Sequence, residues 1–396
     1  MDLQTRIKEA NIPQLQDLFK RVVSLNDYMS DNPEISGHEV EASKRIVALL
    51  ESEGYDVQCP FDGISTSFKA IFGPQIHKRN VAILVEYDAL PEIGHGCGHC
   101  VSGSISLLAG LMLRHHQQEL NANIHLIGTP IEETDGAKAS MVKNGVFNQY
   151  HMAIMLHMFD SNVLSPAMLA IDTTLYTFHG KSAHSSASPW EGRNAFNSAQ
   201  LMFHAIDMLR QHVKPDIRMH GIIRNPGHAP NIVPEVCSLE LYSRSMNREY
   251  LNEVNRMIDK CAEGAAIATG TRWEKEATSN SYDNLLTNQT GIEVLRGIYK
   301  ELNLKINDES SLFFGSSDIG NVSMVCPTFH STLQLADEGV QIHTSEFANY
   351  TKGNRAEKAI MDGAKIIALH IARVFSCSML YEQMQAEFSA AKVTPD

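Results

Sequence analysis

The chain has 396 residues and a formal net charge of −13, because 46 Asp and Glu residues outnumber 33 Lys and Arg residues. An acidic chain without a run of Lys and Arg is poorly suited to binding nucleic acid or an anionic membrane. Its 43% apolar and 20% charged residues are ordinary for a globular protein and exclude disorder, collagen and coiled coil as the main architecture. At roughly 150 residues per domain, the length predicts two or three domains.

The distribution of apolar residues and cysteines favours a cytoplasmic protein. The sequence contains no stretch of about 18 apolar residues, so we expect no membrane-spanning segment. Residues 1–12 are polar and charged, which argues against a secretory signal. The seven cysteines are scattered and odd in number, so we expect no disulfide framework and a reducing environment.

Helices and strands alternate over the first part of the chain. Residues 81–86 begin with the apolar run Val-Ala-Ile-Leu-Val, which is typical of a strand covered on both faces. A first helix around residues 15–23 ends before Pro33, because proline cannot continue a helix. The other predicted elements are helices over 40–50, 101–113 and 138–144 and strands over 67–72, 123–127 and 152–156. This order predicts an α/β domain with a mostly parallel central sheet.

The pattern changes after residue 167. The predicted elements there are strands over 169–178, 221–223, 236–243 and 271–273 and helices over 195–209 and 251–268. Their order predicts a small α+β sandwich. Beyond residue 284 the helix–strand pattern of the first part returns, with helices over 291–302 and 364–374 separated by loops rich in Gly and Ser. We therefore expect a larger split domain, 1–167 and 284–396, with a smaller domain, 168–283, inserted into it.

Four clusters of side chains carry groups suited to catalysis or metal binding. The segment 95–100 reads His-Gly-Cys-Gly-His-Cys and follows a predicted strand, as do Glu132-Glu133 and His157, while His343 comes much later. The carboxyl ends of parallel strands meet at one edge of a sheet, where ligand sites form. Imidazole, thiolate and carboxylate groups are ligands for zinc, manganese and related ions. Of two adjacent carboxylates, one can bind metal while the other moves protons for a water molecule.

Each cluster also has a simpler interpretation. A single histidine is usually structural, and Glu132-Glu133 after a proline is typical of a solvated helix N-terminus. Cys97 and Cys100 have the spacing of a redox pair, although neither a second pair nor a thioredoxin-like context supports that interpretation. The location of three clusters at predicted strand ends favours a metal site over these alternatives.

Taken together, the motifs resemble those of the M20 metallopeptidases. The closest resemblance is to the amidohydrolase branch that contains aminobenzoyl-glutamate hydrolases, auxin-conjugate hydrolases and aminoacylase-1-like dipeptidases. The motifs that carry it are Asn32–Ser36, Glu86–Pro91, Cys97–His99, Glu132-Glu133, His157, Gly180–His184, Ala229–Pro234, Gly315–Ser323 and His343. They cover nearly the whole chain and are highly specific in combination.

The resemblance implies a catalytic domain with two divalent ions, zinc or manganese, per chain. The implied metal ligands are Cys97, His99, Glu133, His157 and His343, with the Cys97 thiolate bridging the two ions.

Three further positions bear on this implied centre. Glu132 would be the general base and then the general acid. Asp88 would not bind metal itself but would orient one of the metal ligands. Position 100 carries Cys where close relatives more often carry Asn or Asp, and this residue is not an implied ligand.

The inserted domain resembles a lid that also dimerises. His184 would donate to the oxyanion of the tetrahedral intermediate, and Asn231 and Arg244 match lid positions that bind substrate in relatives. The Arg244 guanidinium suits a bidentate pair with a substrate carboxylate, although a surface strand residue is the alternative interpretation. Ser316 in the Gly-rich loop offers a hydroxyl for a hydrogen bond to substrate.

The function implied is hydrolysis of an amide bond in a small N-acyl amino acid or dipeptide. One alternative is the same site acting on a specialised metabolite amide or in the synthetic direction. Another is a metal-containing binding protein without turnover, against which the intact Glu132 argues.

Overall fold

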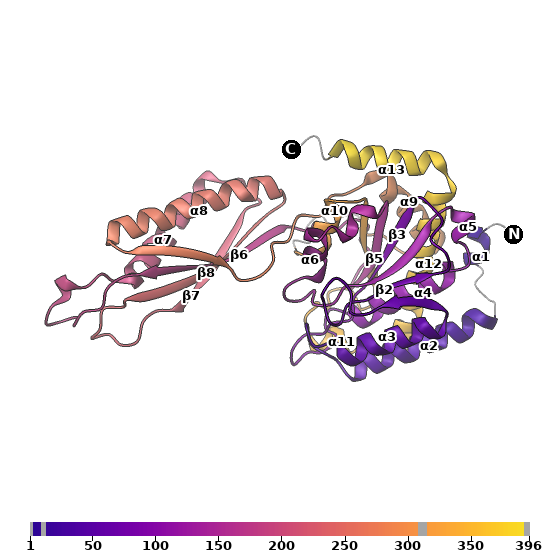
Figure 1. Cartoon of the computed structure of the whole chain (residues 1–396), viewed down its shortest axis with the longest axis horizontal. Coiled ribbons are helices and arrows are strands. Elements are labelled where there is room, and N and C mark those ends of the chain that lie inside the picture. The colour runs from indigo at the N-terminus through magenta and orange to yellow at the C-terminus, as the bar shows by residue number, and fades with distance from the viewer. Residues whose placement is uncertain (1–2, 9–12, 308–314, 392–396) are drawn as a thin grey trace. The chain divides into compact units, whose positions relative to one another are not determined.

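The computed structural model describes residues 3–8, 13–307 and 315–391, which form two compact units. The first unit combines the chain up to Ala167 with the chain from Leu285 onward, and the second unit is Met168–Asn284. Each unit is built around its own sheet (Figure 1).

A six-stranded, mostly parallel sheet forms the centre of the first unit. Its strands are β1 (Tyr55–Gln58), β2 (Lys69–Phe72), β3 (Asn80–Val85), β4 (Asn123–Gly128), β5 (Met152–Phe159) and β10 (Thr328–Gln334). Their order is β1-β2-β4-β3-β5-β10, in which β4, β3, β5 and β10 run parallel and β1 and β2 pair antiparallel at one edge. The carboxyl ends of the four parallel strands therefore lie along one edge of the sheet.

Helices cover both faces of this sheet. The helices are α1 (Leu3–Lys8), α2 (Pro13–Asp31), α3 (Val40–Ser52), α4 (His99–Leu113), α5 (Gln117–Leu120), α6 (Ala137–Lys143), η1 (Val146–Gln149), α9 (Gln289–Glu301), α10 (Ile319–Ser323), α11 (Ser345–Ala348), α12 (Asn354–Ser376) and α13 (Ser378–Ala391). Alternate residues of β3 enter two different apolar clusters: Val81 and Ile83 pack with α4 and α12, and Ala82 and Leu84 pack with α6 and α10. Burial on both faces explains why β3 is a continuous apolar run.

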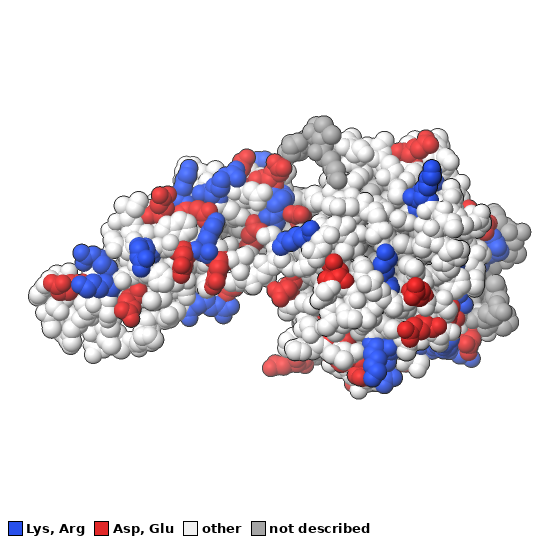
Figure 2. Space-filling view, viewed as in Figure 1, with Lys and Arg blue, Asp and Glu red and all other residues white. Residues whose placement is uncertain are grey.

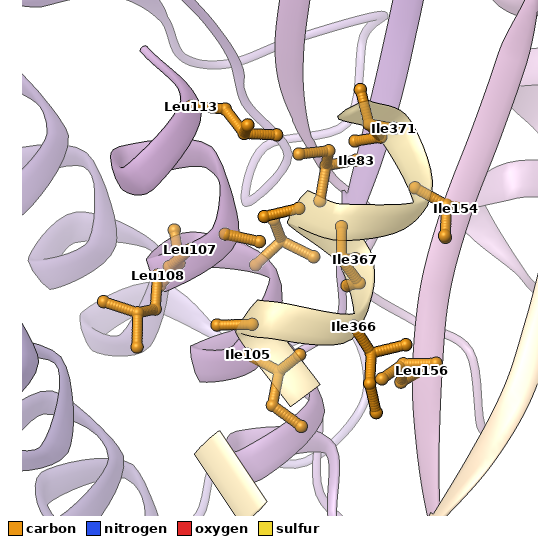
Figure 3. Packing of buried hydrophobic residues seen from close by; sticks show 14 of the residues in the cluster. Ile83, Ile105, Leu107, Leu108, Leu113, Ile154, Leu156, Ile366, Ile367 and Ile371 are labelled. Carbon is orange, nitrogen blue, oxygen red and sulfur yellow. The ribbon is translucent and has the colours of Figure 1, made fainter. Parts of the chain in front are cut away.

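Close packing fixes α4 against the sheet. Isoleucine and leucine side chains of α4, α12, β3 and β5 fill this part of the core (Figure 3). Glycines permit the short separations, because a Cβ at Gly103 would come within 2.2 Å of the Glu86 carbonyl oxygen and one at Gly363 within 2.6 Å of Ile105. The amino end of α4 is thereby held beside the residues that follow β3.

The second unit is a four-stranded antiparallel sheet with two helices. Its strands β6 (Ala170–His179), β7 (Arg218–Asn225), β8 (Val236–Ser245) and β9 (Arg272–Ala277) have the order β7-β8-β6-β9, and its helices are α7 (Ala195–Leu209) and α8 (Arg248–Thr269), with short 3₁₀ turns η2 (Pro189–Glu191) and η3 (Arg210–His212). Both helices share one apolar cluster with the sheet, so they cover the same face. Asn194 and Asn247 cap the two helices through their side-chain oxygens, as expected for asparagine at this position.

The predicted fold class is confirmed: a mostly parallel α/β sheet with a second, antiparallel α+β unit. One expectation is wrong, because the segment expected to be only loop between residues 302 and 364 contains β10, and α12 begins at Asn354. Buried Ser331 and Thr332 give β10 its polar sequence, and their hydroxyls bind the Leu164 and Ser161 carbonyl oxygens at 2.6 and 2.7 Å.

The surface carries charges of both signs. On the face shown in Figure 2, Lys and Arg side chains are interspersed with Asp and Glu and do not gather into one basic patch. Within the described residues no single helix has the length and apolar composition of a membrane span; α12 and α13 pass that test only as a pair, across a 97° bend.

Candidate active site

Several predicted site residues of the first unit lie at or just after the carboxyl ends of its parallel strands. Cys97 lies in the segment after β3, His99 is the first residue of α4, and Glu132-Glu133 follow β4. His157 lies within β5, which continues to Phe159, so the expectation that it follows the strand is wrong.

A backbone contact brings the distant His343 to the same place. Its N–H donates to the Gly96 carbonyl oxygen at 2.9 Å, and its φ of +62° is unusual for a residue other than glycine.

Five side chains converge on one point. Cys97 Sγ lies 3.4 Å from His157 Nε2 and 3.3 Å from His343 Nε2, and His343 Nε2 lies 3.7 Å from Glu133 Oε2. Among the described residues, four sets of three ligand atoms lie within 4.8 Å of one another, and two of them contain Cys97: one with His99 and His157, the other with Glu133 and His343. Cys97 belongs to both sets, which is the arrangement that a bridging ligand requires.

The donor atoms fit a metal centre. Buried His99 Nε2 and Glu133 Oε1 have no hydrogen-bond partner in the described structure. Bond lengths of about 2.3 Å to sulfur and 2.0 Å to nitrogen place tetrahedral ligand atoms roughly 3.5 Å apart, close to the separations around Cys97. Burial and then the charge of Glu133 raise the pKa of the Cys97 thiol well above its usual range, so its thiolate form needs a cation beside it.

Asp88 orients one of the ligands. Its Oδ1 lies 3.0 Å from His99 Nδ1, which directs the opposite ring nitrogen into the cluster. Its Oδ2 accepts from Ser36 Oγ at 2.6 Å and from Glu133 N at 3.0 Å. Burial alone would raise the pKa of Asp88, but the charge and hydrogen bond of His99 outweigh burial and hold that pKa well below its usual range.

Glu132 lies beside the cluster and is 12% exposed. Its Oε2 is 4.0 Å from His99 Nε2. Burial and then the negative charge of Glu86 raise the pKa of Glu132 well above its usual range. A raised pKa makes a carboxylate a stronger base and brings its proton-donating form closer to neutral pH.

A buried lysine that the sequence does not single out lies beside Glu132. Lys138 Nζ lies 2.7 Å from Glu86 Oε1 and 2.5 Å from Asp318 Oδ1, and all three side chains are buried. Glu86 Oε2 in turn lies 3.5 Å from His99 Nε2. The only hint in the sequence is that Lys138 begins a short predicted helix just after Glu132-Glu133.

The sequence does not single out His330, because the polar residues of β10 do not predict a strand. Its ring lies 5.6 Å from that of His157, and neither ring nitrogen has a hydrogen-bond partner in the described structure. Burial lowers the pKa of His330 to about 3, which keeps the ring neutral behind the cluster.

The cysteines do not support a redox pair. None of the seven, all of which lie within the described residues, forms a disulfide, and burial raises the pKa of Cys100 to about 12. A thiol that stays protonated is a poor nucleophile.

Four other predicted site residues do not belong to the sets of ligand atoms described above. His184, Asn231 and Arg244 belong to the second unit, whereas half-buried Ser316 belongs to the first. His184 pairs with Ile232 in an antiparallel bridge, and Arg244 lies on β8.

The ring of His184 has a defined hydrogen-bonding pattern. Its Nδ1 accepts from the N–H groups of Ser186 at 3.3 Å and Ala187 at 3.2 Å. A neutral ring with Nδ1 as acceptor carries its proton on Nε2. Exposed His184 therefore presents an N–H donor.

Comparison with known proteins identifies the family. The sequence pattern described as "Peptidase family M20/M25/M40" matches residues 82–373. The chain is 29% identical to Xaa-Arg dipeptidase of Mus musculus, over 96% of this chain and 92% of that protein. It is 25% identical to a p-aminobenzoyl-glutamate hydrolase chain of Escherichia coli (strain K12), over 93% of this chain and 92% of that protein.

A solved structure supports the same fold. A dinuclear metal-binding peptidase of family M20 from Bacillus subtilis superposes with a TM-score of 0.71 at 18% identity, over 91% of this chain and 99% of that one. The resemblance to the M20 metallopeptidases found in the sequence is thus confirmed, and the chain is a hydrolase belonging to peptidase family M20/M25/M40.

Proposed function

We propose that this protein hydrolyses an amide bond in a small N-acyl amino acid or dipeptide, using two divalent ions. The observation that carries the proposal is the position of Cys97 Sγ in two sets of ligand atoms. The relatives named Xaa-Arg dipeptidase and p-aminobenzoyl-glutamate hydrolase support this substrate class.

Five residues would hold the ions. Cys97 would bridge them, and His99, His157, Glu133 and His343 would complete the two coordination shells. The thiolate suits zinc, and the mixed imidazole and carboxylate ligands also accept manganese. When bound, the ions polarise the scissile carbonyl and lower the pKa of a water molecule.

Glu132 would move the proton. It accepts a proton from the attacking water, and the oxygen of that water forms a bond to the amide carbon. Glu132 then delivers the proton to the leaving nitrogen as the carbon–nitrogen bond breaks. The raised pKa of Glu132 supports both roles.

The second unit would act as a lid over the substrate and as a dimerisation surface. The Nε2 proton of His184 suits donation to the oxyanion, because a neutral ring can donate this proton in a hydrogen bond without bringing a positive charge into a closed site. Arg244 would pair with the substrate carboxylate, and Asn231 would bind the substrate amide. Ser316 would contribute a hydroxyl from the first unit. Closure of a lid would exclude water from the reaction.

The test is metal content together with turnover. The protein is stripped with a chelator and reloaded with zinc, manganese or cobalt, and released amine is measured with N-acyl amino acids, aminobenzoyl-glutamate and β-alanyl dipeptides. We expect about two ions per chain and hydrolysis that returns with metal. Glu132→Gln should retain both ions and lose at least about 100-fold in turnover, whereas Glu382→Gln on the surface of α13 should change neither. Absence of stoichiometric metal, or normal turnover of Glu132→Gln, would refute the proposal.

A further inference from the structure

The turn that carries Glu132 and Glu133 begins with a strained residue. Ile131 has a φ of +66°, in the left-handed region. This conformation is rare for any residue with a Cβ and rarer still for a β-branched one. A strained backbone persists only where surrounding contacts hold it.

The Ile131 carbonyl oxygen accepts from Gly136 N at 2.8 Å within the turn, and the Ile131 N–H is held by a buried carboxylate from a distant part of the chain. The Ile131 N–H donates to Glu39 Oε1 at 3.1 Å, and Glu39 is fully buried. Oε1 of Glu39 also accepts from Gly37 N at 2.7 Å, and its Oε2 accepts from Thr66 Oγ1 at 3.0 Å. Glu39 thus joins the segment before α3 and the segment before β2 to the turn after β4.

Glu39 has no helix-capping role that would explain its burial. It occupies the N-cap position of α3, yet its side chain makes no capping hydrogen bond to that helix. Burying a carboxylate is costly unless hydrogen bonds compensate, and here the donors are the N–H groups of Ile131 and Gly37 and the Thr66 hydroxyl. Burial raises the pKa of Glu39.

The opposite end of the turn is held by a second carboxylate. Glu133 N donates to Asp88 Oδ2 at 3.0 Å, so the segment that carries Glu132 and Glu133 lies between two buried carboxylates, Glu39 and Asp88. If Ile131 relaxed to a negative φ, the chain direction at Glu132 would change, and both carboxylates would leave their positions near His99 and His343.

We propose that Glu39 is a positioning residue, which fixes the left-handed conformation of Ile131 and thereby aims Glu132 at the substrate and Glu133 at the metal. This inference rests on the proposed hydrolytic function for its kinetic consequences, but its effect on metal binding is independent of turnover. A positioning contact of this kind typically changes metal affinity or activity by about 10- to 100-fold.

Two substitutions separate the acceptor of Glu39 from its charge. Glu39→Met keeps the length of the side chain and removes the acceptor, so cobalt affinity and kcat should each fall at least about tenfold. Glu39→Gln keeps an oxygen for Ile131 N and can turn its amide nitrogen to Thr66, so it should stay within about threefold of the unchanged protein. Equal losses in the two variants would overturn the proposal, because charge and not positioning would then be at work.

The decisive variant relieves the strain. Glycine adopts a positive φ without cost, so Glu39→Met/Ile131→Gly should recover most of the cobalt affinity and kcat lost by Glu39→Met. A merely structural loss at Glu39 would not be repaired by a substitution at Ile131, and failure of this rescue would refute the assignment.

A matched control comes from a similar contact far from the site. Gln117 is buried and accepts from Ile124 N at 2.7 Å, so Gln117→Met also removes a side-chain acceptor from a backbone N–H. It should lower the unfolding midpoint without changing cobalt affinity or kcat. Cobalt binding is followed by the visible absorption of the ion without substrate. If the protein binds cobalt but shows no turnover, the proposed function is refuted. The cobalt affinities of the variants would still test the role of Glu39.

Discussion

Replacing Lys138 by methionine tests whether the charges beneath the site are organised around this one ammonium group. Its Nζ lies 2.7 Å from Glu86 and 2.5 Å from Asp318, with all three groups buried. At an effective dielectric constant near 20, each contact carries roughly 6 kcal/mol of attraction, most of which offsets the cost of burying the charges. Removing one partner of a buried pair leaves an uncompensated charge, so we expect Lys138→Met to lower the free energy of unfolding by about 3–5 kcal/mol.

The loss of stability in Lys138→Met should depend on pH. Burial raises the pKa of Asp318 even though Lys138 opposes the rise, so removal of Lys138 raises that pKa further. A carboxyl whose pKa is higher in the folded than in the unfolded state destabilises the fold above that folded pKa, and the penalty disappears as pH falls and the carboxyl is protonated. The difference between Lys138→Met and the unchanged protein should therefore be smaller at pH 5 than at pH 8.

The assay is urea unfolding at both pH values, in chelator so that metal binding does not enter the comparison. Lys44→Met is the control, because the Lys44–Glu41 pair is exposed and its loss should cost less than about 1 kcal/mol. Lys138→Met/Asp318→Asn should recover part of the stability, since it removes one of the unpaired charges. A cost below about 1 kcal/mol for Lys138→Met, or an equal cost at both pH values, would refute this reasoning.

Two further predictions concern histidines. His184→Ala should lower kcat by about 100- to 1000-fold while metal content measured by atomic emission stays unchanged; loss of metal would instead make His184 a ligand. His370 is buried against Phe329, and burial lowers its pKa to about 3, below the value of about 6.5 in an unfolded chain. Protonation therefore favours unfolding once the pH falls below about 6.5, which costs about 2 kcal/mol between pH 7 and pH 5. In His370→Leu the decline in stability over this range should be smaller by about that amount, and an unchanged decline in urea unfolding would contradict the assignment.

The strands that could be predicted are those whose sequence reflects their burial directly. β3 and β5 are apolar because both faces are covered, and their positions follow from the sequence alone. β10 is equally buried but contains His330, Ser331 and Thr332, whose polar groups suggest a loop. Two of these residues bind the carbonyl oxygens of the 161–164 segment, a compensation that depends on the folded chain.

The candidate ligands could be predicted because three of their clusters lie at or near the ends of predicted strands and the whole set resembles the motifs of the M20 metallopeptidases. Glu39, Lys138 and His330 could not be predicted in this way, since their significance lies in what they contact. Glu39 contacts a turn that begins at residue 131, and Lys138 contacts a carboxylate at residue 318. A buried Glu or Lys looks the same in a single sequence as an exposed one on a helix surface.

The site contains several features that each cost stability, and the contacts around them explain how they persist. Ile131 and His343 have positive φ, and His99 Nε2 and Glu133 Oε1 are buried without hydrogen-bond partners in the described structure. Such features survive only on a rigid support. Backbone hydrogen bonds to Glu39 and to the Gly96 carbonyl oxygen hold Ile131 and His343. His99 is held by the contact between α4 and the chain after β3, which is so close that only glycine fits at position 103. The position of His99 is thus set by the apolar packing of α4 against α12 and the sheet, and a metal that satisfies the unpaired donors would return part of the stability that these features cost.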